Sequence, residues 1–360
     1  MLAHSAEELM EVARKFHSYL PDPQTYANLR PFYQTWAQID PDAAFAGARA
    51  IPDLLCREIA TEQVAQSARP EGAGRIAQLM LEQPEGTYRT ELKDRLVDTA
   101  IGNWSQSNPA AAAQFLESRP ELLARNVGNL VGNWGWIDPP AALAWFDQHA
   151  DVGPERFSVF QELMTGWVQK APVGAADYIL DHIDEPRASV ALGTVAFGLF
   201  YVDNNVAKDW VVKLPAGELR SGAAGEIASA WASDDPSAAA VWAATQPPED
   251  AMQALTATAA AWARKDAHAM LQWTNTLPLD SRNQILRHAI ISSSLSMTPE
   301  SKLTVAGTIS DSDLQREALT YVLNEWRESD PASAETWIRS RSPAERAALS
   351  ASLSEQNLGP

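Results

Sequence analysis

The 360-residue chain is poor in cysteine and lysine, with one cysteine, Cys56, and seven lysines. A single cysteine excludes an internal disulfide framework and a four-cysteine zinc site. The net charge of −18 leaves little basic surface for nucleic acid or an anionic membrane, where Lys and Arg supply most of the affinity. No apolar run is long enough to span a bilayer. We therefore expect no nucleic-acid binding and no membrane insertion, whereas a basic protein partner fits the charge.

Catalytic and cofactor motifs are missing from the sequence as well. It contains no Gly-x-Ser-x-Gly, Walker, Rossmann or His-Glu-x-x-His pattern. Asp311-Ser-Asp313 lacks the later glycine and closing glutamate of a calcium loop, and it is better interpreted as a capped helix start. Alternating β-branched runs between hairpin turns are absent, which excludes a sheet. We expect a non-enzymatic protein without catalytic residues, metal or cofactor.

What the sequence does contain is a repeat marked by tryptophan, W-x-x-x-[D/N]-P-x-A-A-x-x-W. Eleven of the 13 tryptophans fall on its first or last position. We call the first position the anchor. Spaced 29 to 39 residues apart, the ten anchors are Trp36, Ala65, Trp104, Trp134, Trp167, Phe200, Trp231, Trp262, Ser294 and Trp326. The longest spacing follows Ala65 and contains residues 81–89, which we interpret as an inserted loop.

Each unit encodes its own helix start. Four residues after the anchor comes a side chain that caps helix N-termini, and a proline usually follows it, where its fixed φ suits the first helical residue. The capping positions are Asp40, Asn108, Asp138, Asn204, Asp235, Asp266, Thr298 and Asp330. Two small residues and then an aromatic one follow on the same side of a short helix. A longer helix with apolar residues seven, four and three before the next anchor completes the unit.

These units predict an all-α fold: a right-handed α-solenoid of about ten antiparallel helical hairpins with a period near 32 residues. We assign residues 1–20 to an N-terminal capping helix and residues 21–342 to the tandem repeats. Residues 343–360 form a C-terminal capping helix and tail. Nothing in the composition marks a linker between domains.

Over residues 20 to 355 the units resemble the α-solenoid superfamily, with tetratricopeptide-like and HEAT-like arrays as the nearest relatives. Tetratricopeptide repeats carry Trp, Leu-Gly and Tyr in their first helix, whereas here that helix reads Pro-x-Ala-Ala-x-x-Trp. The unit is also similar to tryptophan-containing DP-x-AA repeats of bacterial proteins. The resemblance implies a scaffold that binds other macromolecules and brings no catalytic residue.

Two tryptophans break the register and are the best candidates for exposed binding residues. Trp136 falls in the turn of its unit, and Trp210 lies one residue before the usual aromatic position. The alternative for Trp210 is that it is a buried core residue that compensates for the irregular sequence of its unit. Arginines also recur early in the longer helices, including Arg95, Arg125 and Arg156. They either form a ladder with acidic residues of neighbouring repeats or line a groove that recognises carboxylates or a peptide backbone.

We expect an interaction scaffold that binds a protein or peptide partner on its concave surface. Two alternatives remain: a structural spacer in a bacterial assembly, without groove residues, and an α/α-toroid carbohydrate-active enzyme, with about six or seven hairpins and carboxylates in loops. The composition is compatible with a soluble cytoplasmic protein and with an exported one whose leader is absent from this chain.

Overall fold

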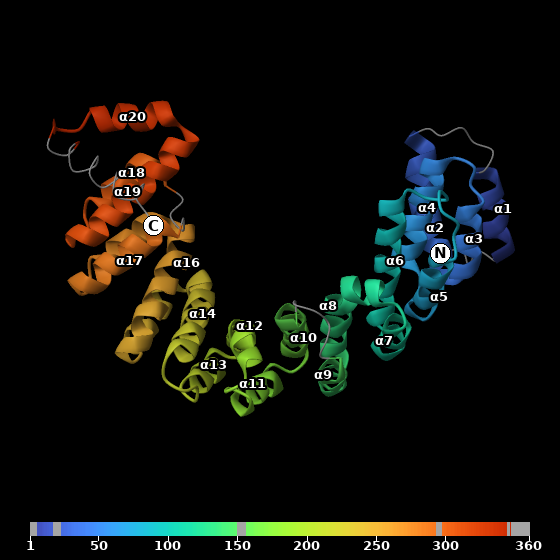
Figure 1. Ribbon diagram of the computed structural model, residues 1–360, viewed down its shortest axis with the longest axis horizontal. Helices are drawn as coiled ribbons and strands as arrows, with labels where there is room; N and C mark the ends of the chain where they lie inside the picture. The colour runs from blue at the N-terminus through green and yellow to red at the C-terminus, as the bar shows by residue number, and fades with distance from the viewer. Residues whose placement is uncertain (1–5, 17–22, 150–155, 293–296, 344–345, 347–360) are drawn as a thin grey trace. The chain divides into compact units, whose positions relative to one another are not determined.

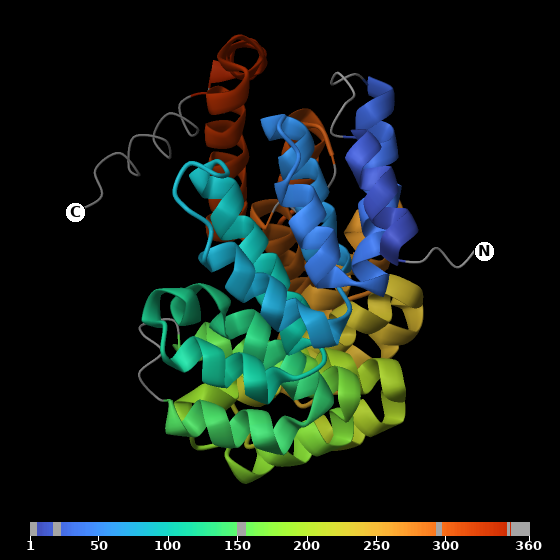
Figure 2. The same cartoon turned by 90° about the vertical axis from the view of Figure 1, so that its right-hand side faces the viewer.

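The computed structural model describes residues 6–16, 23–149, 156–292, 297–343 and 346. The chain divides into two compact units, Met1–Ala175 and Ala176–Pro360, which we describe separately. All regular structure in these residues is helical, as Figures 1 and 2 show, and this confirms the all-α prediction. Within the described residues no helix is long and apolar enough to cross a membrane.

The first unit begins with a single helix and continues as pairs of short and long helices. Its helices are α1 (Ala6–Phe16), α2 (Pro23–Ile39), α3 (Pro41–Arg49), α4 (Leu54–Ser67), α5 (Pro70–Leu81), α6 (Thr90–Ser105), α7 (Pro109–Glu117), α8 (Pro120–Ile137), α9 (Pro139–Gln148) and α10 (Arg156–Lys170). α11 (Pro172–Asp181) spans the boundary between the units. The expected N-terminal capping helix corresponds to α1, while most of the expected C-terminal one lies outside the described residues.

The second unit repeats the alternation. Its helices are α12 (Pro186–Val202), α13 (Asn204–Val211), α14 (Glu218–Asp234), α15 (Pro236–Ala244), α16 (Pro248–Thr274), α17 (Leu279–Ile291), α18 (Pro299–Ala306), α19 (Ser312–Ser329) and α20 (Pro331–Arg339). α16 is two helices joined at a kink, because Asp266 has non-helical φ and ψ of −155° and 93°. Its carboxylate accepts a hydrogen bond from the Ala269 N–H at 2.9 Å, so the second part of α16 starts with the predicted cap.

Helices pack on their neighbours in the chain. In the first unit each long helix lies against the next, in the order α2, α4, α6, α8 and α10, while each short helix packs on the long helix beside it (Figure 1). In the second unit α12, α14 and α16 follow the same order. The chain is therefore an array of sequential helix pairs, as the hairpin repeat predicts.

The predicted caps form in most units. The side chains of Asp40, Asn108, Asp138, Asp235 and Asp330 each accept a hydrogen bond from the N–H three residues on. Thr298 and Asp266 do the same. In each of the first five, the cap's own N–H donates to the anchor carbonyl four residues back. One short motif therefore ends the long helix and starts the short one.

The prediction of a cap at Asn204 is wrong by one residue. Asp203 is the N-cap of α13, its carboxylate accepts from the Asn205 N–H at 2.7 Å, and its N–H donates to the Leu199 carbonyl. Leu199, and not Phe200, therefore occupies the anchor position. Asp203 follows Leu199 by the usual four residues, but no proline marks the helix start, and the aromatic Phe200 beside Leu199 placed the predicted register one residue too late.

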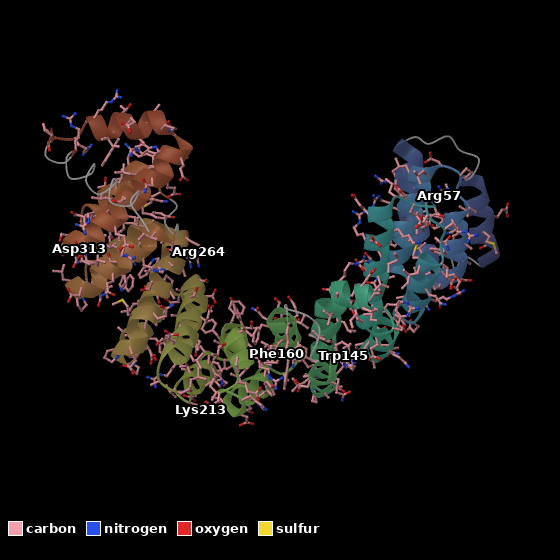
Figure 3. The ribbon with its side chains drawn as sticks, viewed as in Figure 1. Arg57, Trp145, Phe160, Lys213, Arg264 and Asp313 are labelled. Atoms are coloured by element: carbon pink, nitrogen blue, oxygen red, sulfur yellow. The ribbon has the colours of Figure 1, made fainter. Side chains whose placement is uncertain are left out.

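The in-phase tryptophans lie in the packing between helices. None of them is exposed, and Trp36, Trp134, Trp145 and Trp326 are buried. Figure 3 shows Trp145 and Phe160 among the packed side chains of the first unit. In five units the anchor ring packs against the second aromatic, with centroids 5.4–6.4 Å apart. The in-phase tryptophans therefore take part in the packing between the long and short helices of a unit, four of them buried and the others partly buried.

The inserted loop after α5 is held by a buried carboxylate. Glu58 of α4 is 3% exposed and accepts hydrogen bonds from the Arg89 backbone N–H at 3.2 Å and from its guanidinium at 2.6–3.0 Å. Burial alone would raise the pKa of Glu58, but the hydrogen bonds and charge of Arg89 bring the pKa below its ordinary value. Tyr88 is buried beside it and receives a hydrogen bond from Thr61 at 3.3 Å.

Candidate binding groove

Trp136 is the exposed tryptophan of the described chain. It lies in the last turn of α8, two residues after its anchor Trp134, and its side chain is 50% exposed while Trp134 is 8% exposed. An indole left half in water is a common feature of binding surfaces, because it offers a large rigid apolar face at low entropic cost. The expectation that Trp136 is exposed is confirmed.

A groove between α8 and α10 lies next to this indole. Glycines let the two helices approach until their backbones touch: a Cβ on Gly135 would meet the Leu163 carbonyl oxygen, and one on Gly166 would meet that of Gly132. Gly128, Gly132 and Gly166 line a cavity of about 200 Å³ on the surface of this contact. Trp136 forms part of its wall.

The remaining lining of the groove is polar. Asn129 and Glu162 are exposed, and Thr165 and Gln169 complete the α10 side. Among the described residues Glu162 has no ion-pair partner. Lys170, also on α10, places its ammonium 5.3 Å from the centroid of the Trp136 ring. The groove therefore combines one apolar face with hydrogen-bonding groups and an available carboxylate.

The second unit carries an equivalent face between α12 and α14. Counted from the corrected anchor Leu199, Tyr201 occupies the position of Trp136, and it is 59% exposed. Its ring packs on Phe197, 49% exposed, with centroids 4.8 Å apart. Gly193 aligns with Gly128, and Glu226 of α14 lies over Gly193 much as Glu162 lies over Gly128. Sequence reasoning missed Tyr201 because the register of this unit was misplaced by one residue.

Trp210 does not belong to a surface site, and the expectation that it is exposed is wrong. Its side chain is 3% exposed, and its indole N–H donates to the Ala176 carbonyl at 3.2 Å. Trp210 lies seven residues after the cap Asp203, the same distance that separates Asp138 from Trp145. The ring is thus in phase with the other second aromatics, and the buried Ala207 fills the small-residue position before it.

The three candidate arginines contact acidic residues of the first unit. Arg125 pairs with Asp98 at 3.0 Å, and hydrogen bonding to Asp98 raises the Arg125 pKa. Arg95 lies 3.7 Å from Glu62. Both partners belong to the preceding long helix, which is the ladder arrangement. Arg156 lies 3.9 Å from Asp147 and over the Phe146 ring.

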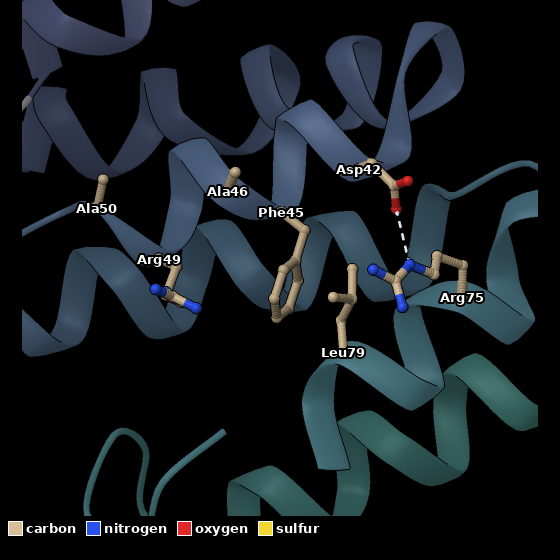
Figure 4. A pocket seen from close by; sticks show the side chains of 7 residues that line it. All are labelled: Asp42, Phe45, Ala46, Arg49, Ala50, Arg75 and Leu79. Carbon is tan, nitrogen blue, oxygen red and sulfur yellow. Dashed lines mark ion pairs between the residues drawn. The ribbon is translucent and has the colours of Figure 1, made fainter. Parts of the chain in front are cut away.

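Two larger cavities are lined by charged side chains that are partly paired with one another or with neighbouring residues. One, of about 490 Å³, lies between α3 and α5, where Arg49 and Arg75 flank Phe45 and Leu79 (Figure 4). Arg75 is paired there with Asp42 at 3.8 Å. The other, of about 480 Å³, lies in the second unit.

The second-unit cavity contains Arg287, which forms a bidentate pair with Glu317. Asp311 in the same cavity caps α19 by accepting from the Asp313 and Leu314 N–H groups, as the capped-start interpretation predicted.

Two histidines and the single cysteine are held in the helix packing. No group of three His, Cys, Asp or Glu residues suited to a metal occurs among the described residues. His149 and His182 each hydrogen-bond through Nδ1 to the carbonyl four residues back and stack on the aromatic ring of that residue. Cys56 is buried, and desolvation, helped by Asp53, raises its pKa to about 11.

No protein-family model matches the chain, and comparisons with curated proteins and solved structures find no similar protein. The groove is therefore interpreted from its own chemistry.

Proposed function

We propose that the protein is a non-enzymatic scaffold that binds a segment of a partner protein along the exposed face of its long helices. The observation that supports this most is Trp136, a half-exposed indole beside a polar groove, in a repeat that buries its other tryptophans at least partly. A right-handed solenoid with a period near 32 residues and a concave binding face is part of the same proposal.

Binding in this proposal needs no chemistry beyond burial and hydrogen bonding. An apolar side chain of the partner covers the indole, while Asn129, Thr165 and Gln169 hydrogen-bond its backbone or polar groups. A few such anchors typically supply most of the affinity of an interface. Arg95, Arg125 and Arg156 contribute indirectly in this proposal, because their contacts hold neighbouring helices in place.

The test uses the variant Trp136→Gln, alone and with Tyr201→Gln. Glutamine occupies the same repeat position at Gln38, Gln106 and Gln169, all exposed, so the fold should tolerate it. We expect the wild-type protein to enrich a consensus from a random peptide display library and the double variant to lose that enrichment.

The matched control is Val241→Gln, which removes a 69% exposed apolar side chain from the short helix α15. It should select the same peptides as the wild-type protein, and circular dichroism should be unchanged for all variants. Enrichment that survives the double variant, or no enrichment by the wild-type protein, would contradict the proposal.

A further inference from the structure

Both units carry the same three-part constellation on the exposed face of their long helices. It consists of an exposed aromatic residue two positions after the anchor, a glycine six positions before the anchor, and a glutamate from the next long helix over that glycine. The members are Trp136, Gly128 and Glu162 in the first unit and Tyr201, Gly193 and Glu226 in the second. One such arrangement would be unremarkable on an acidic surface, but its recurrence in register indicates a common use.

The glycine brings the carboxylate onto the face. An ideal Cβ on Gly193 would lie 3.4–3.7 Å from Cγ, Cδ and Oε1 of Glu226, and one on Gly128 would lie 3.6 Å from Cγ of Glu162. The glutamate side chains therefore lie across the preceding helix where a larger residue would displace them. Both glutamates are exposed, and within the described chain neither has an ion-pair partner.

We propose that each constellation recognises a basic side chain of the partner at the glutamate and an apolar or aromatic side chain at the exposed ring. This inference rests on the proposed function and specifies its partner. The net charge of −18 favours the approach of a basic segment. At the ring of the first unit, Lys170 already supplies a cation to the indole face, which leaves that end to an uncharged side chain.

The helix geometry sets the spacing of the recognised residues. Gly128 and Trp136 are eight residues apart on α8, which is about 12 Å along the axis at about 1.5 Å per residue. An extended peptide covers that distance in about four residues, and side chains four apart in an extended chain point to the same side. The predicted recognition pattern is thus basic-x-x-x-apolar. The pair Gly193 and Tyr201 has the same separation on α12.

The test measures fluorescence anisotropy with a labelled peptide containing Lys-Ala-Ser-Ala-Leu, a counterpart with Glu in place of Lys, and one with a single residue between Lys and Leu. We expect the first peptide to bind at least about tenfold more tightly than the Glu counterpart and more tightly than the shortened one. Glu162→Gln and Glu226→Gln should each weaken binding by about threefold, which is the range of an exposed ion pair, and the double variant by more.

Two control variants separate recognition from general attraction to an acidic protein. Glu85→Gln and Asp209→Asn remove one exposed carboxylate from each unit, away from these faces. They should leave binding unchanged. Equal losses in the control and test variants, or equal affinity for the Lys and Glu peptides, would overturn the inference.

The failures of the two proposals are distinguishable. If library peptides depend on Trp136 and Tyr201 but not on the two glutamates, the scaffold proposal stands and the basic-partner inference fails. If the wild-type protein enriches no library peptide, the scaffold proposal itself fails. Binding of a neutral oligosaccharide such as chitotriose that Trp136→Gln abolishes, with no peptide bound, would overturn both.

Discussion

In this protein, residues of the same type have different roles, and the role of each depends on its contacts. Thirteen tryptophans include one, Trp136, that is left half in water, while Trp210 is buried with its N–H satisfied. Carboxylates differ in the same way: Asp138 caps a helix, Glu58 is buried and paired with a guanidinium, and Glu162 is exposed in the lining of the groove. The role of Asp138 is set within its own helix start, whereas the surroundings of Glu58 are set by a residue 31 positions away in the chain.

The buried pair in the inserted loop gives a pH-dependent prediction. Glu58→Ala removes the acceptor of the Arg89 hydrogen bonds and should lower the free energy of unfolding by about 1–3 kcal/mol at pH 7. Because the folded-state pKa of Glu58 lies below its ordinary value of 4.5, its contribution is complete above that pH and is lost as the pH falls through the folded pKa. Urea unfolding of both proteins should therefore show a difference that narrows towards pH 3.

Glu62→Ala, one turn further along α4, is the control for this measurement. Glu62 forms a longer contact with Arg95, at 3.7 Å, and Arg95 is largely exposed. Its loss should cost no more than about 1 kcal/mol. Equal costs for the two substitutions, or a difference that widens in acid, would show that burial of Glu58 does not matter.

At the scale of helices, close approach depends on a few small residues. The rings of Trp36 and Trp104 lie where a Cβ on Gly47 and Gly74 would be, each at 2.6 Å. In these two places a tryptophan ring of one helix fills the space that a glycine of the neighbouring helix leaves open. Under the groove glycines act differently, because Gly132 and Gly166 let the backbones of α8 and α10 touch.

Two Gly→Ala substitutions test this packing, because they should change the stability in opposite directions. Gly74→Ala places a methyl group 2.6 Å from the Trp104 ring and should destabilise the protein by about 1–3 kcal/mol through overpacking. Gly102 lies inside α6 with nothing within 4 Å of an added Cβ, so Gly102→Ala should stabilise by about 0.5–1 kcal/mol through higher helix propensity. Thermal unfolding of the two variants should move in opposite directions, and a shared direction would contradict the packing described.

At the scale of the whole molecule, the excess of 46 acidic over 28 basic side chains is the dominant feature. Ion pairs such as Arg125 with Asp98 and Arg220 with Asp250 use part of the basic complement within the fold. The remaining negative charge repels itself and is expected to favour basic partners.

This excess predicts a stabilising effect of salt. Raising NaCl from about 20 mM to 500 mM shortens the Debye length from tens of ångströms to a few, which weakens self-repulsion more than it weakens the close pairs. The midpoint of thermal unfolding should rise. A falling midpoint would mean that the ion pairs outweigh the net charge, and scanning calorimetry at both salt concentrations would decide this.

The sequence by itself determined the helical repeat, because caps, prolines and small residues act within one or two turns of the chain. Asp138 with Pro139 starts a helix whatever surrounds it, and the period of the tryptophans predicts which faces are buried. The sequence also identified Trp136 as an exception. The sequence-based register failed at Asn204, because the aromatic Phe200 was assigned as the anchor in place of Leu199; the cap is Asp203, and the one-residue shift made Trp210 look out of phase.

Only the tertiary structure decided how those faces are used. The approach of α8 to α10 depends on Gly132 and Gly166 meeting across two repeats, a contact no local pattern specifies. The partners of Arg95 and Arg125 lie about 30 residues away and became visible only once the long helices were packed. Tyr201 became a candidate only when the hydrogen bond from the Asp203 N–H to the Leu199 carbonyl fixed the register of its unit. Hydrogen bonds at the helix ends define which positions of two repeats are equivalent, and distance along the chain only approximates this.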